Sequence, residues 1–394
     1  MKQILYLAWR YLAYHRIKTT ILIVSITLIV YVPVGLRVLV GQSERELTTR
    51  AEATPLVIGA KGSPLELVLN TLYFESDVPA PMRSEEVTRV AESGLAWVIP
   101  VYTRFRARSH PIIGTTLDYF EFRGLEIAEG RAMAVLGECV LGSDVAGKIG
   151  VGPGGHVVSS PENVFDLAGV YPLRMKVVGV LERTHTPDDR VIFVDLKTSW
   201  VIEGLGHGHE DMSQPEAAPG VLRREGNKFV ANASVSQFNE ITPDNIESFH
   251  FHGDTGEFPV TAALVVPQDE KSSALLQGRY LSPDERVQVA VPSSVMDELL
   301  STILTVQSYV VTAVIIVGVS TLATAALVFM LSLRLRRREI QTMMKIGGSR
   351  GSVLGVLASE IVVVLAVGIV LAGGLTALTS RFGSEIIRAV ILSG

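Results

Sequence analysis

The sequence predicts a membrane protein, with a helical transmembrane bundle of three strong spans and a large α+β extracytoplasmic domain. Three apolar runs are each long enough to cross a bilayer core, which requires about 20 helical residues. A mixed segment, residues 41–298, separates the first run from the other two. Lys and Arg are concentrated on one side of these runs, and this asymmetry sets the expected orientation.

The first predicted span covers residues 19–40, and residues 1–18 before it are patterned as a cytoplasmic interfacial helix. A cleaved signal peptide is the alternative interpretation. We expect a retained anchor instead, because the run starts late and no small-x-small cleavage site follows it. Pro33 within the span is tolerated where a neighbouring helix satisfies the freed carbonyl group.

The second predicted span, residues 299–333, contains no Asp, Glu, Lys or Arg and exceeds the length that a bilayer requires. Its excess is expected to continue as a helical stalk. The third span, residues 352–380, is interrupted only by Glu360. Residues 381–394 form a short C-terminal segment, which is too short to cross and is patterned as an interfacial helix.

Short-range counts of Lys and Arg place the N-terminus and the coupling loop, residues 334–351, in the cytoplasm. Residues 41–298 and the C-terminus then lie outside, in a periplasmic domain with stalk helices. The cytoplasmic side carries the larger number of basic residues: Lys2, Arg10, Arg16, Lys18, Arg334, Arg336, Arg337, Arg338, Lys345 and Arg350. The opposite side carries fewer: Arg37, Arg45, Arg50, Arg381 and Arg388.

Composition argues against a nucleic-acid partner and excludes an internal disulfide. The net charge of −5 and the pI near 6.0 argue against a nucleic-acid partner. A single cysteine, Cys139, excludes an internal disulfide, so the outside domain needs its own hydrophobic core. A domain of this length is large enough to form one.

Short Val-, Ile- and Leu-rich runs bounded by turn residues predict strands in the outside domain. These strands are Val98–Val101, Val135–Leu141, Met175–Leu181, Val191–Val194 and Ala262–Val266. Helices are expected at Leu65–Leu72, Ser84–Glu92 with Ser84 as its N-cap, and Asp269–Leu281. The mixture indicates an α+β domain with a second lobe near residues 200–260, in which residues 203–228 and 252–258 form loops.

Motifs for catalysis are weak in this chain. Residues 150–155, GVGPGG, fit G-x-G-x-x-G by letters, but a strand pattern follows where a dinucleotide site needs a helix, so we expect a glycine turn between strands. No H-E-x-x-H occurs. Cys139 lies in a predicted strand and is expected to be a buried structural thiol. The run Asp188-Asp189-Arg190 predicts a turn with a local ion pair.

Two H-x-H pairs, His207 with His209 and His250 with His252, are candidate metal ligands. Imidazole with nearby carboxylates suits zinc or copper. Residues i and i+2 of an extended chain point the same way, so each pair can chelate. The alternative is a solvated loop with scattered histidines, and zinc is a possible cofactor only if the pairs meet.

Glu360 lies about seven residues into the third run, and an ionisable group at that depth is a functional hypothesis. It pairs with a basic residue of the cytoplasmic loop or with a partner subunit, or its carboxylate reaches back to the interface. Small residues one turn apart, Gly368/Ala372 and Gly373/Ala377, allow close helix approach. Because three spans hardly enclose a pathway, we expect a dimer.

Two motif regions resemble those of MacB/LolC/FtsX-like (type VII) ABC transporter permeases. Gly137–Gly152, GECVLGSDVAGKIGVG, is similar to the family's G-E-x-V-L-G segment, and Arg338–Arg350, REIQTMMKIGGSR, to its R-E-I loop. The order of spans and domain also matches over nearly the whole chain. Segments starting at Val57 and Thr186 resemble a subgroup linked with LolD-like ATPases. Relatives usually carry a fourth span, which residues 381–394 are too short to form.

The resemblance implies a permease subunit in the bacterial inner membrane that works by mechanotransmission, exporting or extracting a lipophilic or periplasmic substrate. It implies a separate LolD/MacB-like ATPase holding ATP and Mg²⁺, a second permease copy, and a periplasmic adaptor or binding protein. The chain itself is then not an enzyme and holds no nucleotide. The implied ATPase-coupling residues are Arg338, Glu339, Ile340, Met344, Lys345, Ile346, Gly347, Gly348 and Arg350. Alternatives are a non-transporting FtsX-like transducer and a zinc-linked transport or sensing system.

Overall fold

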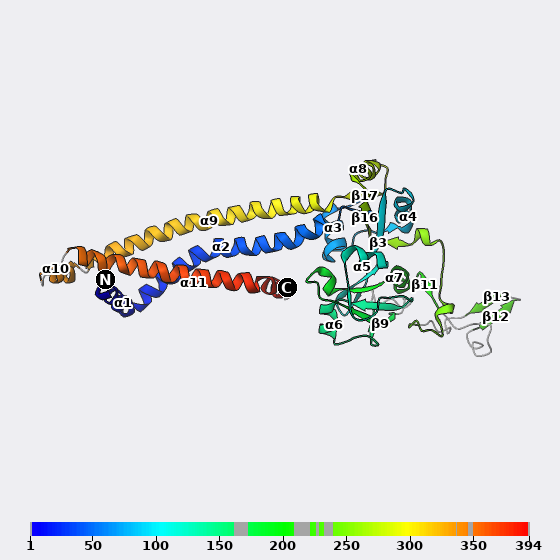
Figure 1. Ribbon diagram of the computed structural model, residues 1–394, viewed down its shortest axis with the longest axis horizontal. Helices are drawn as coiled ribbons and strands as arrows, with labels where there is room; N and C mark the ends of the chain where they lie inside the picture. The colour runs from blue at the N-terminus through cyan, green and yellow to red at the C-terminus, as the bar shows by residue number, and fades with distance from the viewer. Residues whose placement is uncertain are drawn as a thin grey trace. The chain divides into compact units, whose positions relative to one another are not determined.

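The computed structural model describes residues 2–160, 172–208, 221–225, 228–231, 239–335, 337–345 and 350–392 (Figure 1). The chain divides into two compact units. One is helical and comprises residues 1–49 and 297–394. The other is a mixed α+β domain, residues 50–296.

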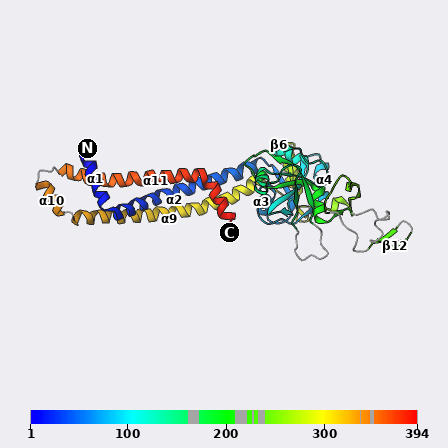
Figure 2. The same ribbon diagram turned by 90° about the horizontal axis from the view of Figure 1, so that it is seen from below.

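The helical unit is built from α1 (Lys2–Tyr14), α2 (Arg16–Glu52), α9 (Pro292–Leu335), α10 (Arg337–Lys345) and α11 (Arg350–Leu392). Three of these are long and apolar enough to cross a membrane, over Arg16–Gly41, Pro292–Thr324 and Ala358–Phe382. Both views show α2, α9 and α11 running side by side in this unit (Figures 1 and 2). Residues 381–392 continue α11 without a break, where the sequence predicted a separate short helix.

Small residues set the contact between α2 and α11. A Cβ atom on Gly368 would lie 2.7 Å from Ile26 Cγ2, so only glycine allows this approach. Thr27 donates its hydroxyl to its own helix and lies 3.3 Å from the carbonyl oxygen of Gly368, and Ala372 one turn later is buried. The predicted contact at Gly368/Ala372 is therefore present, whereas a Cβ on Gly373 would meet nothing within 4 Å among the described residues.

The domain is organised around an 11-stranded mixed sheet (Figure 1). In spatial order its path is β17 (Val287–Ala290), β1 (Leu56–Ala60), β16 (Ala262–Pro267), β3 (Ala96–Tyr102), β5 (His110–Thr115), β10 (Ile192–Asp195), β7 (Glu138–Leu141), β9 (Arg174–Leu181) and β6 (Ile127–Gly130). Two short strands extend it, β4 (Arg106–Ala107) beside β5 and β8 (His156–Val158) beside β9. The β5–β10 and β7–β9 pairs are parallel and the remaining pairs are antiparallel.

Helices of the domain begin at the ends of strands. They are α3 (Pro64–Tyr73), α4 (Ser84–Glu92), α5 (Leu117–Arg123), α6 (Ser143–Ile149), α7 (Leu196–Glu203) and α8 (Glu270–Arg279). Side chains of Ser63, Asp195 and Asp269 accept backbone N–H groups at the starts of α3, α7 and α8. The N-cap of α4 is Arg83 without a side-chain cap, so the prediction of Ser84 at that position is wrong.

Three small two-stranded sheets complete the domain. They are β2 (Met82–Arg83) with β15 (Pro259–Val260), β11 (Gly206–His207) with β14 (His250–Phe251), and β12 (Val221–Glu225) with β13 (Lys228–Ala231). The β11–β14 ribbon is the one that carries histidines. Much of the lobe predicted near residues 200–260 lies outside the described residues.

Candidate functional site

The last turn of α2 belongs to the domain and carries a buried arginine. Arg50 is 8% exposed and its guanidinium lies 2.6 Å from a carboxylate oxygen of Asp188, which is 1% exposed. Arg50 also donates to the carbonyl oxygen of Leu72 and, at 2.8 Å, to the hydroxyl of Tyr119. The Tyr119 hydroxyl donates in turn to Asp188. Every group of this buried network is therefore hydrogen-bonded.

A short 3₁₀ turn, Pro187–Arg190, holds Asp188 in place. Thr186 caps the turn, and Asp189 accepts the backbone N–H groups of Thr184 and His185. A Cβ on Gly142 would lie 2.4 Å from the carbonyl oxygen of Asp188, so glycine is needed for β7 and the turn to approach. The G-E-x-V-L-G segment that starts at Gly137 therefore allows the turn that carries Asp188 to pack against the end of β7.

The predicted local ion pair in Asp188-Asp189-Arg190 is wrong. Asp188 bonds to Arg50, 138 residues away, and Arg190 lies 3.4 Å from Glu75. Asp189 is buried, and its carboxylate accepts two backbone N–H groups. It makes no ion pair with Arg190 of the same turn. The local sequence therefore predicted the turn correctly, but not the ion-pair partners of Asp188 and Arg190.

Burial pushes the pKa of Asp188 upward, but the charge and hydrogen bonds of Arg50, with the hydrogen bond from Tyr119, outweigh it. The pKa of Asp188 is therefore below its ordinary value. Burial raises the pKa of Tyr119 to about 12, and the negative charge of Asp188 adds to that rise. At neutral pH the network consists of a cation, an anion and a neutral phenol.

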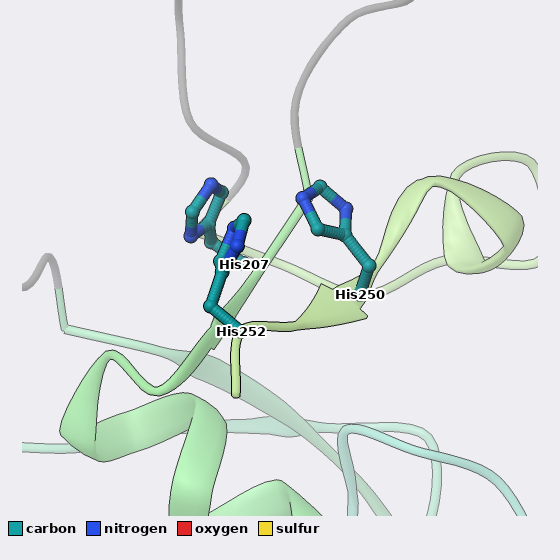
Figure 3. A group of neighbouring side chains, drawn as sticks. All are labelled: His207, His250 and His252. Atoms are coloured by element: carbon teal, nitrogen blue, oxygen red, sulfur yellow. The ribbon is translucent and has the colours of Figure 1, made fainter. Parts of the chain in front are cut away.

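Three histidines meet on the β11–β14 ribbon (Figure 3). His207 and His250 are direct cross-strand partners in the antiparallel register, and His252 follows two residues after His250. The backbone N–H of His252 donates to Leu205, which continues the ladder. Candidate ligand nitrogens of the three side chains all lie within 4.8 Å of one another. The rings gather at one place beside the ribbon (Figure 3).

The other face of the ribbon packs on aromatic side chains. Phe251 lies with its ring centroid 6.4 Å from Trp200 and 6.1 Å from Phe258. A Cβ on Gly206 would be 2.6 Å from the Phe251 ring, so glycine leaves the space that the ring fills. Because successive residues of a strand face opposite sides, this packing directs His207 and His250 away from the core.

The predicted metal ligands are thus partly brought together. His207, His250 and His252 form one group, and His209 lies outside the described residues. Spacing within each pair could not show that the two pairs meet. The two pairs meet because β11 and β14 pair in an antiparallel register that places His207 opposite His250.

The predicted coupling residues are divided between two helices and the gap between them. Five lie on α10: Arg338, Glu339, Ile340, Met344 and Lys345. Arg350 is the first residue of α11, and Ile346, Gly347 and Gly348 lie outside the described residues. Ile340 and Met344 share one face of α10, and the side chain of Met344 is 40% exposed.

Glu360 and Cys139 are both covered. The side chain of Glu360, on α11, is 3% exposed, so it does not reach a free surface of the helical unit as the snorkelling alternative requires. Cys139 on β7 is fully buried as expected, and burial raises the pKa of its thiol to about 12.

The residue 150–155 glycine run follows α6 and precedes β8, so the predicted turn between two strands is instead a helix-to-strand turn.

Comparison with known proteins supports the family expected from the motifs. The family profile described as the MacB-like periplasmic core domain matches residues 20–212. This match agrees with the resemblance of the chain to MacB/LolC/FtsX-like permeases. Members of this family are membrane components of ABC transporters and are not themselves the ATPase. No curated protein sequence matches the chain.

Solved periplasmic regions show low similarity to this chain. The periplasmic region of MacB from Actinobacillus actinomycetemcomitans is 11% identical, with a TM-score of 0.33 over 66% of this chain and 97% of that one. The extracellular domain of the ABC-type transporter YknZ from Gram-positive bacteria is 13% identical, with a TM-score of 0.31 over 59% and 98%. A periplasmic domain and apolar helices fit an inner-membrane protein with an extracellular domain.

Replacing Arg50 by Met should destabilise the domain strongly. The change leaves Asp188 as an unpaired buried charge, which costs about 3–5 kcal/mol of unfolding free energy. Denaturant unfolding followed by tryptophan fluorescence measures this loss. Arg83→Met, which removes an exposed arginine, is the matched control and should change the unfolding free energy by less than about 0.5 kcal/mol. Equal losses in the two variants would contradict the structural role of the pair.

The Asp188 carboxylate should make the domain sensitive to acid. Its pKa is lower in the folded chain than in the unfolded chain, where an aspartate titrates near about 3.9. Its contribution is therefore fully present above about pH 4 and is lost as the pH falls through the folded pKa. The unfolding free energy of the wild type should fall more steeply below about pH 4 than that of Asp188→Asn. Parallel pH profiles would show that another group controls acid unfolding.

Gly206→Ala should loosen the β11–β14 ribbon without removing any histidine. The added methyl group must displace the Phe251 ring, and overpacking of this kind costs about 1–3 kcal/mol. We expect faster amide hydrogen exchange in peptides that contain His252, measured by mass spectrometry. Gly147→Ala, where a Cβ meets nothing within 4 Å, is the control and should leave those peptides unchanged.

Proposed function

We propose that this chain is the transmembrane subunit of an ATP-driven ABC transporter that works by mechanotransmission. The family supplies the general class, in which an ABC ATPase partner and dimeric assembly are usual. A separate ATPase hydrolyses ATP, and the permease carries the resulting movement to its outside domain. A lipophilic or periplasmic substrate is then exported or extracted.

One observation carries the proposal: a single helix, α2, contains both a candidate span and the buried Arg50. At 1.5 Å per residue its 37 residues measure about 55 Å, against about 30 Å for a bilayer core. The 44 residues of α9 give about 66 Å, and its Met296 is fully buried in the domain. Helices that continue past the bilayer into a packed core are suited to carry force.

The ATPase would bind at α10. Ile340 and Met344 lie one turn apart on one face, whereas Arg338, Thr342 and Lys345 lie on the other. An apolar pair, half-buried Ile340 and exposed Met344, on a helix whose opposite face is cationic fits a partner groove with an apolar floor and an acidic rim. Neither feature requires this chain to bind nucleotide.

Met344→Asp should release the ATPase, because it places a charge on the apolar face of α10. The measurement is the amount of ATPase that co-purifies from native membranes in mild detergent, together with the ATP hydrolysis rate of the purified complex. We expect at least about a ten-fold loss of bound ATPase, equivalent to about 1.4 kcal/mol of binding.

Leu281→Asp is the matched control, since it puts the same charge in place of an exposed apolar side chain of the domain, outside α10. It should retain the ATPase. The proposal fails if Met344→Asp binds and hydrolyses like the wild type, or if no ABC ATPase accompanies the wild-type chain.

A further inference from the structure

We propose that His207, His250 and His252 form a binding site for a divalent transition metal ion, and that Zn²⁺ occupies it through three imidazole nitrogens. The site is on the domain and does not depend on the proposed transport function. It assigns to the β11–β14 ribbon a ligand that neither the family nor the relatives indicate.

The geometry is close to what zinc requires. Zn–N bonds of 2.0–2.1 Å in a tetrahedral site place neighbouring nitrogens about 3.4 Å apart. The three nitrogens here lie within 4.8 Å of one another, so rotation about side-chain torsions closes the remaining distance. Ring centroids are separated by 5.1 Å for His207 and His250, 4.8 Å for His207 and His252, and 4.7 Å for His250 and His252.

A backbone hydrogen bond prepares His250 as a ligand. Its Nδ1 lies 2.9 Å from the carbonyl oxygen of Ser248. A carbonyl oxygen only accepts, so Nδ1 carries the proton and Nε2 carries the lone pair in the neutral ring. Metal-bound histidines commonly have their second nitrogen held in this way, which fixes both the tautomer and the ring orientation.

The donor set selects the class of metal. Three imidazoles suit zinc, copper and nickel, whereas Mg²⁺ and Ca²⁺ require oxygen ligands. Within the described part of the chain, no carboxylate joins this group of potential ligands. The chain's one thiol, Cys139, is fully buried in the sheet and has no access to a metal at the ribbon.

The surroundings indicate an exchangeable ion rather than a structural one. His252 is exposed, and the three ligands found among the described residues leave a fourth position for water or another ligand. The Trp200–Phe251–Phe258 packing supports the ribbon on its other face and includes no metal ligand. We therefore expect the domain to fold without the ion and to take it up and release it.

Calorimetric titration of Zn²⁺ into the full-length protein in nanodiscs tests the site, with a purification tag that contains no histidine. The wild type should bind one ion per chain. His207→Ala, His250→Ala and His252→Ala should each weaken binding at least about ten-fold, because each removes a direct ligand. His185→Asn is the matched control: it removes an imidazole elsewhere in the domain, and asparagine tolerates the φ of 59° found there.

Thermal unfolding separates loss of the site from loss of the fold. Zn²⁺ should raise the melting temperature of the wild type and of His185→Asn but not of the three alanine variants, whose metal-free melting temperatures should match the wild type. If a strand variant melts early without metal, the exposed His252→Ala carries the test. A wild type that binds no better than His252→Ala, or a control that loses as much affinity, overturns the proposal.

Discussion

The buried pair of Arg50 and Asp188 is the contact on which the domain most depends. Its two charges are almost fully removed from water, so losing either one leaves a penalty larger than most single contacts can offset. The pair also ties together parts of the chain that are far apart in sequence. Arg50 closes the first long helix, and Asp188 lies on a turn that β7 holds in place.

The same pair gives a physical reason for the motif that begins at Gly137. Gly142 is needed because the Asp188 and Asp189 backbone comes too close for any side chain. Glu138 accepts backbone N–H groups of Ala134 and Val135 and pairs with Arg131, which fixes the loop before β7. A sequence signature of this kind therefore indicates how the domain packs around the last turn of α2, and it carries no information about a substrate.

Sequence reasoning succeeded where one segment determines its own structure. The three apolar runs became long helices, and the strands predicted at residues 98–101, 175–181 and 262–266 are present with slightly different ends. In the strand predicted at Val135–Leu141, residues 135–137 form a turn, because Gly137 adopts a φ of 85°. The strand β5 was missed because its sequence, HPIIGT, contains only two large apolar residues, Ile112 and Ile113, between turn-forming residues.

Contacts between residues far apart in the sequence could not be predicted from the local sequence. Nothing around Asp188 indicates Arg50, and the local arginine was the simpler but wrong choice. The histidine pairs were recognised from their spacing, yet only the pairing of β11 with β14 brings His207 next to His250. In both cases the missing information was the fold itself.

The burial of Cys139 makes this chain convenient for measuring its own motions. The only thiol of the native sequence is shielded within β7 and poorly ionised. Spin labels or fluorophores attached through a cysteine introduced elsewhere would therefore report from a single chosen position, with the wild-type residue left in the sheet. Distances between such labels on the helical unit and on the domain would test whether the two units rearrange during ATP hydrolysis, as the proposed function requires.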